Sequence, residues 1–305
     1  MKRLVGLSTG YLIKIFGECG ALDAAKRAGA DAVDLDLTCQ DLRRQNSVYA
    51  QGEDAVRAYY REVGEYAKSI GIVISQTHGR MEGLRSDAHE DDVLLRNIRL
   101  DCIATAAVGA PVCVLHTTTT IFMGPDADPE EMFHLNRALF SRAIPFAKSL
   151  GIKLATETFG DAVGFGCVDF FGDLNNFLRG YREVKSDPEL ADNFTVCIDT
   201  GHCNKARPFG NPSAGNVIRA VGKDIRVLHL NDNDGLTDQH KMPLSGSIDW
   251  EDVLDALEEV GYQGVYSMEI KLAFYGPEVA EQYAALAVSV MRNMLKKRYP
   301  ADFAE

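Results

Sequence analysis

An alternation of short apolar runs with longer helix-forming segments constrains this chain more than any other feature. Eight runs rich in apolar and β-branched residues recur along it, at 3–9, 32–37, 71–77, 111–116, 152–158, 195–200, 225–230 and 264–270. The segments that carry helical periodicity lie at 21–28, 54–70, 91–108, 129–150, 172–183, 214–221, 250–260 and 277–297. Strands that alternate with helices are typical of βαβ units and a parallel sheet. Because eight parallel strands can close on themselves, the sequence predicts an α/β fold, a single (β/α)8 barrel domain over residues 1–305.

The length of the chain agrees with one barrel. A chain of 305 residues that is 46% hydrophobic can bury a large core, and (β/α)8 barrels of roughly 250 residues and more form one domain. The alternative architecture, an open doubly wound sheet, carries a GxGxxG turn after its first strand, and this chain has no such turn there. Two loops rich in glycine or proline, at 160–172 and 208–215, are expected to lie over the site.

The balance of charge narrows the range of partners. The formal net charge is -12 and the pI is about 5.1, which disfavours binding to nucleic acid or to an anionic membrane. The apolar run near the amino terminus is interrupted by Lys14 and has no small-residue cleavage site after it, so we interpret it as a first strand and not as a secretory signal. No stretch approaches the roughly 18 apolar residues that cross a bilayer. We therefore expect a cytoplasmic protein without a membrane span.

Histidines collect where the predicted strands end. Of the seven histidines, only His89 and His134 fall in or beside predicted helices. The other five lie in or just after predicted strands: His78, His116, His202, His229 and His240. In a closed barrel the carboxyl ends of all strands open on one face, and the chemistry of such enzymes sits there. The sequence therefore predicts a histidine-rich site on that face.

Three carboxylates interrupt otherwise apolar runs. Glu157, Asp199 and Glu269 stand in LATETF, VCIDTGH and YSMEIK respectively. A buried, unpaired carboxylate costs several kcal/mol, so each needs a cation, a hydrogen-bond cage or a metal. Lysine and arginine are sparse in these strands, and His202 and His229 are expected nearby. Carboxylate oxygen and imidazole nitrogen favour a shared divalent ion. A buried hydrogen-bond network is the alternative.

Motifs in the second half of the chain carry a resemblance to a known family. They are IDTGH (198–202), HLNDNDG (229–235), DQHKMPLSGSIDW (238–250) and the single residue Glu269. With these motifs the chain resembles, over nearly its whole length, the xylose isomerase-like TIM-barrel superfamily of sugar isomerases and epimerases. That superfamily shares its barrel with abasic-site nucleases of the endonuclease IV type. The resemblance is specific for the superfamily and weak for the substrate.

The ketose 3-epimerase branch of the superfamily implies a metal site and a pair of catalytic residues. Its single-metal ligands match Glu157, Asp199, His229 and Glu269. In that branch the two glutamates also serve as the acid/base pair on opposite faces of the substrate, and the histidine that matches His202 contacts the sugar. This chain departs from the branch at two positions, with Val163 in place of a glutamate and Gly235 in place of an arginine.

The resemblance therefore implies a metal-dependent isomerase or epimerase that transfers a proton next to the carbonyl of a small sugar or sugar phosphate. The cofactor expected is one divalent ion, which is Mn, Mg, Co or Zn, with manganese favoured. The residues expected to bind substrate are His78, His116, His202, His240 and Lys241. Lys241, with Lys205 or Arg207, is a candidate for a phosphate or carboxylate of the substrate, and a solvated loop charge is the alternative. A homo-oligomer remains possible.

Three other functions stay open. A lyase or dehydratase, including one that cleaves C-glycosides, also starts by deprotonation next to a carbonyl. A sugar-binding barrel without catalysis would be favoured by an incomplete metal quartet, and the quartet here is complete. An abasic-site nuclease uses three zinc ions, and all nine ligand types have matches: His78, His116, Glu157, Asp199, His202, His229, Asp238, His240 and Glu269. The sequence lacks the basic stripe that would grip a DNA backbone, so we expect no nucleic-acid partner.

Overall fold

Eight parallel strands form one sheet that closes into a barrel in the computed structural model, which describes residues 3–303. The expected domain, 1–305, extends two residues beyond that range at each end. The strands pair in the order β10-β1-β2-β3-β4-β5-β8-β9. Their bounds are β1 (Val5–Ser8), β2 (Ala32–Asp36), β3 (Val73–His78), β4 (Val112–Leu115), β5 (Lys153–Glu157), β8 (Phe194–Asp199), β9 (Ile225–His229) and β10 (Tyr266–Met268).

The first and last strands of this order meet just beyond the end of β9. The amide of Leu230 donates to the carbonyl of Ser267 at 2.8 Å, and the amide of Glu269 donates to the carbonyl of Leu230 at 3.1 Å. These bonds form a parallel bridge between Leu230 and Met268. The predicted (β/α)8 barrel is thus confirmed, and each of the eight predicted runs overlaps one strand, with β3 and β8 each extending one residue outside the predicted run.

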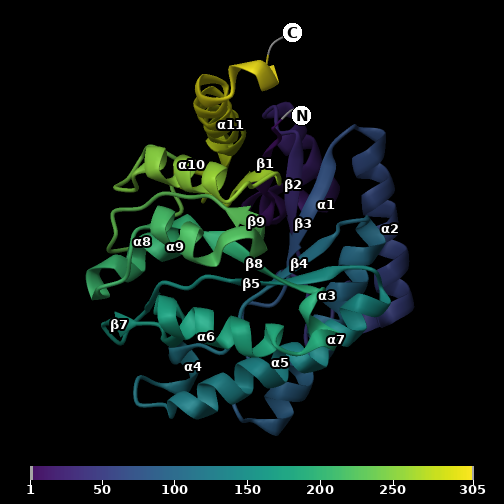
Figure 1. The fold of residues 1–305 in the computed structure, drawn as a ribbon. Coiled ribbons are helices and arrows are strands. Elements are labelled where there is room, and N and C mark those ends of the chain that lie inside the picture. Colours follow the sequence, from purple (N-terminus) through teal and green to yellow (C-terminus); the bar gives the residue numbers. More distant parts are fainter. Residues whose placement is uncertain (1–2, 304–305) are drawn as a thin grey trace.

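Helices surround the strands (Figure 1). They are α1 (Gly10–Arg27), α2 (Glu53–Ser69), α3 (Ala88–Val108), α4 (Thr120–Met123), α5 (Pro129–Ser149), α6 (Leu174–Lys185), α7 (Pro188–Ala191), α8 (Thr200–Ala206), α9 (Ala214–Val221), α10 (Trp250–Glu259) and α11 (Ala280–Arg298). Aspartates stand at the N-cap of several of these helices, because a carboxylate there accepts hydrogen bonds from the free amides of the first turn. Asp87 caps α3 in this way, and Gly109, at φ 82°, ends it in the left-handed conformation that glycine adopts without strain.

The first helix differs from the prediction. Helix was expected over 21–28, whereas α1 begins at Gly10 and bends sharply at Gly17, whose φ is 71°. Leu12 and Ile13 of its first turns are buried in the core, so an apolar run that follows a strand is here the inner face of a helix. An apolar run of this length fits either element, which is why periodicity did not separate them.

The long loop after β5 also holds regular structure that was not predicted. Within 160–172, β6 (Asp161–Ala162) and β7 (Cys167–Val168) form a short antiparallel hairpin. This hairpin begins four residues after Glu157, at the carboxyl end of the barrel. The segment therefore lies on the face where the site was predicted.

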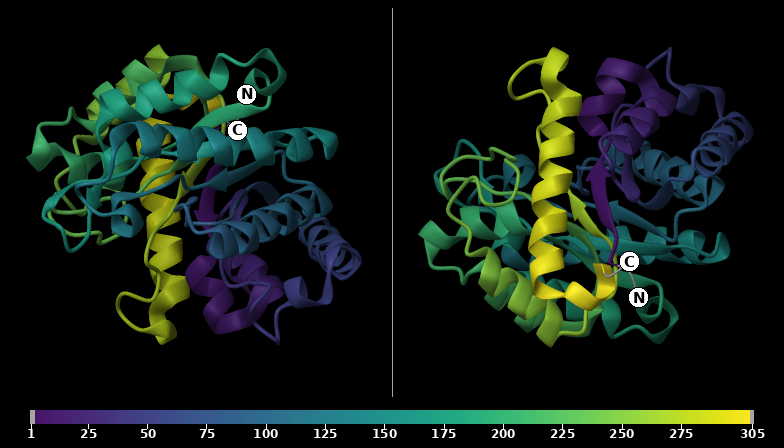
Figure 2. Two further views of the ribbon diagram at one scale, coloured as in Figure 1. Left: turned by 90° about the horizontal axis from the view of Figure 1, so that it is seen from below. Right: turned by 90° about the horizontal axis from the view of Figure 1, so that it is seen from above.

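The main core lies between the strands and the helices, and a smaller apolar cluster fills the barrel interior. That inner cluster consists of Val112, Val114, Ala155, Cys197 and Val227. The carboxyl-terminal helix α11 packs beside β1 and α1, so the two ends of the chain meet (Figure 2). There, Arg3 lies over the ring of Tyr299 and pairs with Asp302 at 3.2 Å. Within residues 3–303, no helix is both long and apolar enough to cross a membrane.

Candidate metal centre at the carboxyl ends of the strands

Residues that the sequence singled out as ligand candidates end four of the eight strands, and another such residue follows a fifth strand. His78, Glu157, Asp199 and His229 are the last residues of β3, β5, β8 and β9, and Glu269 comes directly after β10. The apolar interior cluster stops below them. Because the strands are parallel, their carboxyl ends open on the same face of the barrel. The side chains that the sequence singled out are therefore brought together.

Glu157 lies at the centre of this group and is fully buried. Its Oε2 lies 3.1 Å from His229 Nδ1 and 3.2 Å from His116 Nε2. The same oxygen lies 3.5 Å from His78 Nε2, and its Oε1 lies 3.3 Å from His202 Nδ1. Burial opposes ionisation of Glu157, but the imidazoles of His229 and His116 outweigh it and hold the pKa of this carboxyl well below its usual range. Glu157 is thus a carboxylate among imidazoles.

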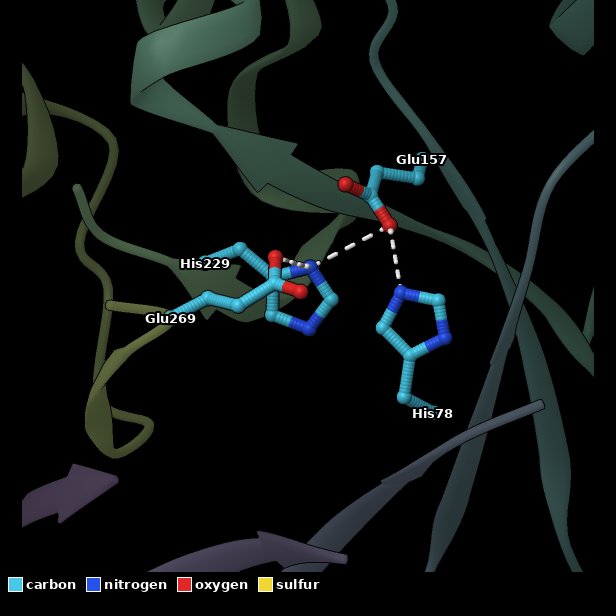
Figure 3. A group of neighbouring side chains, drawn as sticks. All are labelled: His78, Glu157, His229 and Glu269. Carbon is cyan, nitrogen blue, oxygen red and sulfur yellow. Dashed lines mark ion pairs between the residues drawn. The ribbon is translucent and has the colours of Figure 1, made fainter. Parts of the chain in front are cut away.

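Glu269, which follows β10, approaches His229 from another side than Glu157, which ends β5 (Figure 3). Its Oε2 lies 3.3 Å from His229 Nδ1, the nitrogen that also faces Glu157. His78 stacks on His229, with ring centroids 5.1 Å apart and planes 5° from parallel. One ligand atom from each of His78, Glu157, His229 and Glu269 lies within 4.8 Å of the others. These four side chains form the compact donor set of the site.

Asp199, expected in the metal quartet, belongs to neighbouring donor sets. One joins Asp199 to Glu157 and His202, and another joins it to His240 and Glu269. Its Oδ1 caps α8 by accepting from the amide of His202 at 2.7 Å, and its Oδ2 accepts from Asn231 at 2.8 Å. Burial raises the pKa of Asp199 to about 6. His78 thus stands in the compact set where the sequence placed Asp199, and Asp199 lies alongside.

His202, Asp238 and His240 form a further donor set beside the first. His240 Nε2 lies 2.9 Å from Asp238 Oδ2, and His202 Nε2 lies 3.9 Å from Asp238 Oδ1. Burial opposes protonation of His240, but its hydrogen bond with Asp238 raises the pKa of the imidazole to about 10. All nine residues named for their ligand types therefore lie in one continuous cluster.

The basic residues proposed for a phosphate or carboxylate are not equivalent. Lys205 is buried, and its Nζ pairs with Asp161 Oδ1 at 2.5 Å, so its charge is compensated within the protein. Arg207 donates to Asn204 Oδ1 at 3.4 Å. Lys241 pairs through its backbone with Asp232, which fixes its place in the loop after β9.

Two residues near the site were not predicted from the sequence. Asp34, on β2, is fully buried and lies 2.8 Å from the second ring nitrogen of His229. It interrupts an apolar run just as Glu157 does, so the same criterion would have found it. Tyr11 follows β1; burial, and then the negative charges of Glu269 and Asp238, raise the pKa of its hydroxyl. A tyrosine at the start of a helix carries no comparable signal in the sequence.

The donor atoms of the site fit a divalent cation. Both carboxylate oxygens of Glu157, Nδ1 of His229 and Nε2 of His116 are buried and have no hydrogen-bond partner among the described residues. Buried polar atoms are rarely left in this state unless an ion or another group satisfies them. Imidazole nitrogen and carboxylate oxygen together suit zinc, manganese and related ions.

Fold and site together define a (β/α)8 barrel with a buried imidazole–carboxylate cluster at the carboxyl ends of its strands. The chain belongs to the xylose isomerase-like TIM-barrel family, whose model matches residues 22–293.

Two curated relatives match part of the chain. An uncharacterised protein of Methanocaldococcus jannaschii is 28% identical over 205 residues, which cover 62% of this chain and 63% of that protein. Inosose isomerase of Bacillus subtilis is 26% identical over 159 residues, 50% of this chain and 52% of that protein. The chain thus spans between about half and 63% of the length of these relatives.

Solved structures share the fold over nearly the whole chain. The IolI protein with a bound zinc atom has a TM-score of 0.68 at 16% identity, covering 97% of both chains. The 3-keto-D-glucoside 4-epimerase of E. coli has a TM-score of 0.71 at 15% identity, covering 96% of this chain and 100% of that one. D-psicose 3-epimerase of Clostridium cellulolyticum, with D-tagatose, has a TM-score of 0.72 at 14% identity, covering 97% of this chain and 99% of that one. At such identities the likeness establishes the fold.

Proposed function

We propose that this protein is a divalent-metal-dependent isomerase or epimerase of a small sugar or sugar phosphate. The observation that carries the proposal is the convergence of two glutamates, Glu157 and Glu269, on the same nitrogen of His229 from the ends of different strands. Relatives and structural neighbours named as an inosose isomerase and as sugar epimerases support the same class of reaction.

The ion would be held by Glu157, His229 and Glu269, with Asp199 or His78 completing the ligands. When bound, a divalent ion polarises the substrate carbonyl and makes the neighbouring C–H bond more acidic. Zinc in the IolI structure supports a divalent metal for this fold. Manganese is the ion that we favour here from the resemblance in sequence.

The two glutamates transfer the proton in this proposal. The environment lowers the pKa of both carboxyls, burial being outweighed by facing imidazoles, so both are ionised at neutral pH and one is ready to accept a proton. To invert that carbon, the second glutamate first takes up a proton from solvent and then delivers it to the other face, and the first glutamate afterwards releases to solvent the proton that it removed. Return of the proton to the adjacent carbon isomerises the sugar instead.

The remaining polar groups would hold the hydroxyls of the substrate. His116, His202 and His240 surround the carboxylates and are partly exposed, so they can meet a ligand from the mouth of the barrel. Lys241 remains the candidate for a phosphate or carboxylate, since Asp161 already compensates the charge of Lys205.

Deuterium exchange tests the proposal directly. Metal-free protein is reloaded with Mn, Mg, Co or Zn and incubated in D2O with ketohexoses, inososes and 3-keto-glucosides, and the products are followed by NMR. We expect an epimer or isomer that carries deuterium at the reacting carbon, and no conversion by metal-free protein. A product shortened by elimination would replace the isomerase by a lyase, and conversion that is independent of metal would contradict the proposal.

A second candidate function is favoured by the extra donor set of His202, Asp238 and His240. A cluster of nine donors can hold several ions, as an abasic-site nuclease requires. The metal content of the purified protein separates the two. One ion of the manganese, magnesium or cobalt type for each chain supports the isomerase, and three zinc ions support the nuclease.

A further inference from the structure

The second ring nitrogen of His229 faces a buried carboxylate across the barrel. Asp34 stands in the middle of β2, and its Oδ2 lies 2.8 Å from His229 Nε2, which comes from β9, 195 positions later in the chain. Neither side chain is exposed to solvent. Gln76, on β3, donates from Nε2 to the same oxygen of Asp34 at 3.3 Å.

This contact sets the hydrogen on the imidazole. An ionised carboxylate can only accept hydrogen bonds, so Nε2 of His229 must carry a hydrogen to bind Asp34. Nδ1 is then the nitrogen that can lose its hydrogen and offer a lone pair to an ion, and Nδ1 is the atom that faces Glu157 Oε2 at 3.1 Å and Glu269 Oε2 at 3.3 Å. The pair thus directs one particular nitrogen of His229 at the donor set.

His229 differs in this respect from two other histidines of the site. Nδ1 of His78 lies 3.2 Å from the carbonyl of Gly79, and Nδ1 of His202 lies 2.9 Å from the carbonyl of Thr158. These contacts orient the rings through neutral groups. The Nε2 contact of His229 is instead made by a buried side chain that carries a charge when ionised.

We propose that Asp34 is a positioning residue, which fixes the tautomer and orientation of His229 and strengthens its Nδ1 as a metal ligand. Carboxylates that accept from the far nitrogen of a ligating histidine raise its basicity, and their loss weakens metal binding by roughly 10–100-fold. The inference rests on the proposed function, because the ion is the one that the isomerase or epimerase would use. The competing explanation is a structural hydrogen bond that helps only the barrel to pack.

Metal affinity and the spectrum of a bound ion separate these explanations. Asp34→Asn keeps the size of the side chain and one accepting oxygen but removes the charge. Asp101→Asn is the matched control, since Asp101 is equally buried and pairs with Arg80 and Tyr49 outside every donor set. Binding of Mn²⁺ and Zn²⁺ is measured by calorimetry, the absorption spectrum of bound Co²⁺ is recorded, and thermal unfolding is followed without metal.

We expect Asp34→Asn to weaken metal binding by roughly 10–100-fold and to shift the Co²⁺ spectrum. Asp101→Asn should lower the unfolding temperature and leave both metal readouts unchanged. Metal binding by Asp34→Asn at the affinity of the unsubstituted protein, with an unchanged Co²⁺ spectrum, would overturn the proposal. Equal losses of affinity in both variants would also overturn it, because they would reflect general destabilisation.

A measurement on the unsubstituted protein covers the case in which Asp34→Asn does not fold. In zinc-loaded protein labelled with ¹⁵N-histidine, NMR should show His229 with a hydrogen on Nε2 and the metal on Nδ1, and the opposite tautomer would refute the proposal. Neither experiment needs a substrate. If no sugar reacts, the proposed function is refuted and the inference about Asp34 still stands. If the enzyme is active and Asp34→Asn binds metal normally, the inference about Asp34 is refuted and the proposed function still stands.

Discussion

Four imidazoles face the carboxylate of Glu157, those of His78, His116, His202 and His229. Such a residue serves two roles at once, because its charge both attracts an ion and holds the surrounding histidines in place. Glu269 faces fewer imidazoles, and its side chain is partly exposed whereas that of Glu157 is buried. Metal binding and proton transfer therefore have to be separated by experiment.

Substitution of each glutamate by glutamine makes that separation. Glu269→Gln and Glu157→Gln keep the size and one ligand oxygen but remove the group that accepts the proton. We expect activity at saturating metal to stay down by roughly 10²–10⁴-fold in both variants. Glu278→Gln, an exposed glutamate in the loop after β10, is the control and should keep full activity. Recovery of full activity with excess metal would reduce both glutamates to ligands.

The histidines predict how metal affinity varies with pH. Burial lowers the pKa of His229, the histidine that would hold the ion, but the charged groups that face it, Glu157 and Glu269 among them, outweigh burial and raise this pKa well above its usual value. In the metal-free protein at neutral pH the imidazole is therefore protonated on both nitrogens, so an ion that binds Nδ1 must displace a proton. The logarithm of the metal-binding constant should therefore rise between pH 6 and pH 9. For each proton displaced, we expect a rise of about one per pH unit. Calorimetry in buffers of different ionisation enthalpy counts those protons, and affinity that stays constant over this range would contradict the prediction.

At the scale of the elements, the strands were predictable and some of their surroundings were not. Each strand is a short apolar run bounded by polar residues or glycine, and this local pattern is enough to find it. The start of α1 was missed because Leu12 and Ile13 lie in an apolar run that fits a strand or a helix equally well. The hairpin of β6 and β7 was missed because two-residue strands carry no periodicity.

The residues of the site were likewise predictable where the signal is local, and not where it depends on distant partners. Glu157 and Glu269 were visible as polar residues within apolar runs. Asp34 has the same local signal, but its meaning depends on His229, a partner 195 positions away that only the closed barrel brings to it. The place of His78 in the compact donor set depends likewise on the registers of β3, β5 and β9, which residue types alone do not fix.

A partly buried ion pair joins the hairpin to the barrel. Lys205, on α8, holds Asp161 at the start of β6. Lys205→Met removes the charge and leaves Asp161 unpaired, so we expect the free energy of unfolding to fall by roughly 1–3 kcal/mol, less than for a fully buried pair because Asp161 is partly exposed. Amide hydrogen exchange over 161–168 should accelerate more than in α2.

A double variant tests whether the pair itself matters. Lys205→Met combined with Asp161→Asn removes both charges, and it should be more stable than the sum of the two single changes predicts. Strict additivity of the three unfolding free energies, or unchanged exchange in the hairpin, would show that Lys205 does not hold it.

At the scale of the whole molecule, the nine-donor cluster and the net charge of the chain favour different functions. The cluster has the residue types of a three-zinc nuclease, whereas the formal net charge of the chain is -12. A protein that binds duplex DNA gains affinity by replacing counterions along the phosphates with lysine and arginine. Several arginines near the mouth of the barrel are paired with acids, among them Arg43 with Asp41 and Arg85 with Glu90. Their charge is thus compensated within the protein.

We therefore expect the zinc-loaded protein neither to bind nor to incise a duplex that contains an abasic site. Low salt makes the test severe, because the attraction of any basic surface for DNA is then greatest and the repulsion of an acidic one is least screened. Binding is measured by fluorescence anisotropy of a labelled duplex at low and at physiological ionic strength, and incision by gel electrophoresis, with a known abasic-site nuclease as the positive control. A duplex without the abasic site shows whether any binding is non-specific. Efficient incision that needs zinc and is lost in His202→Ala would assign the extra donor set to phosphoester hydrolysis and overturn the isomerase proposal. Without incision, the same donors remain available to hold the hydroxyls of a sugar.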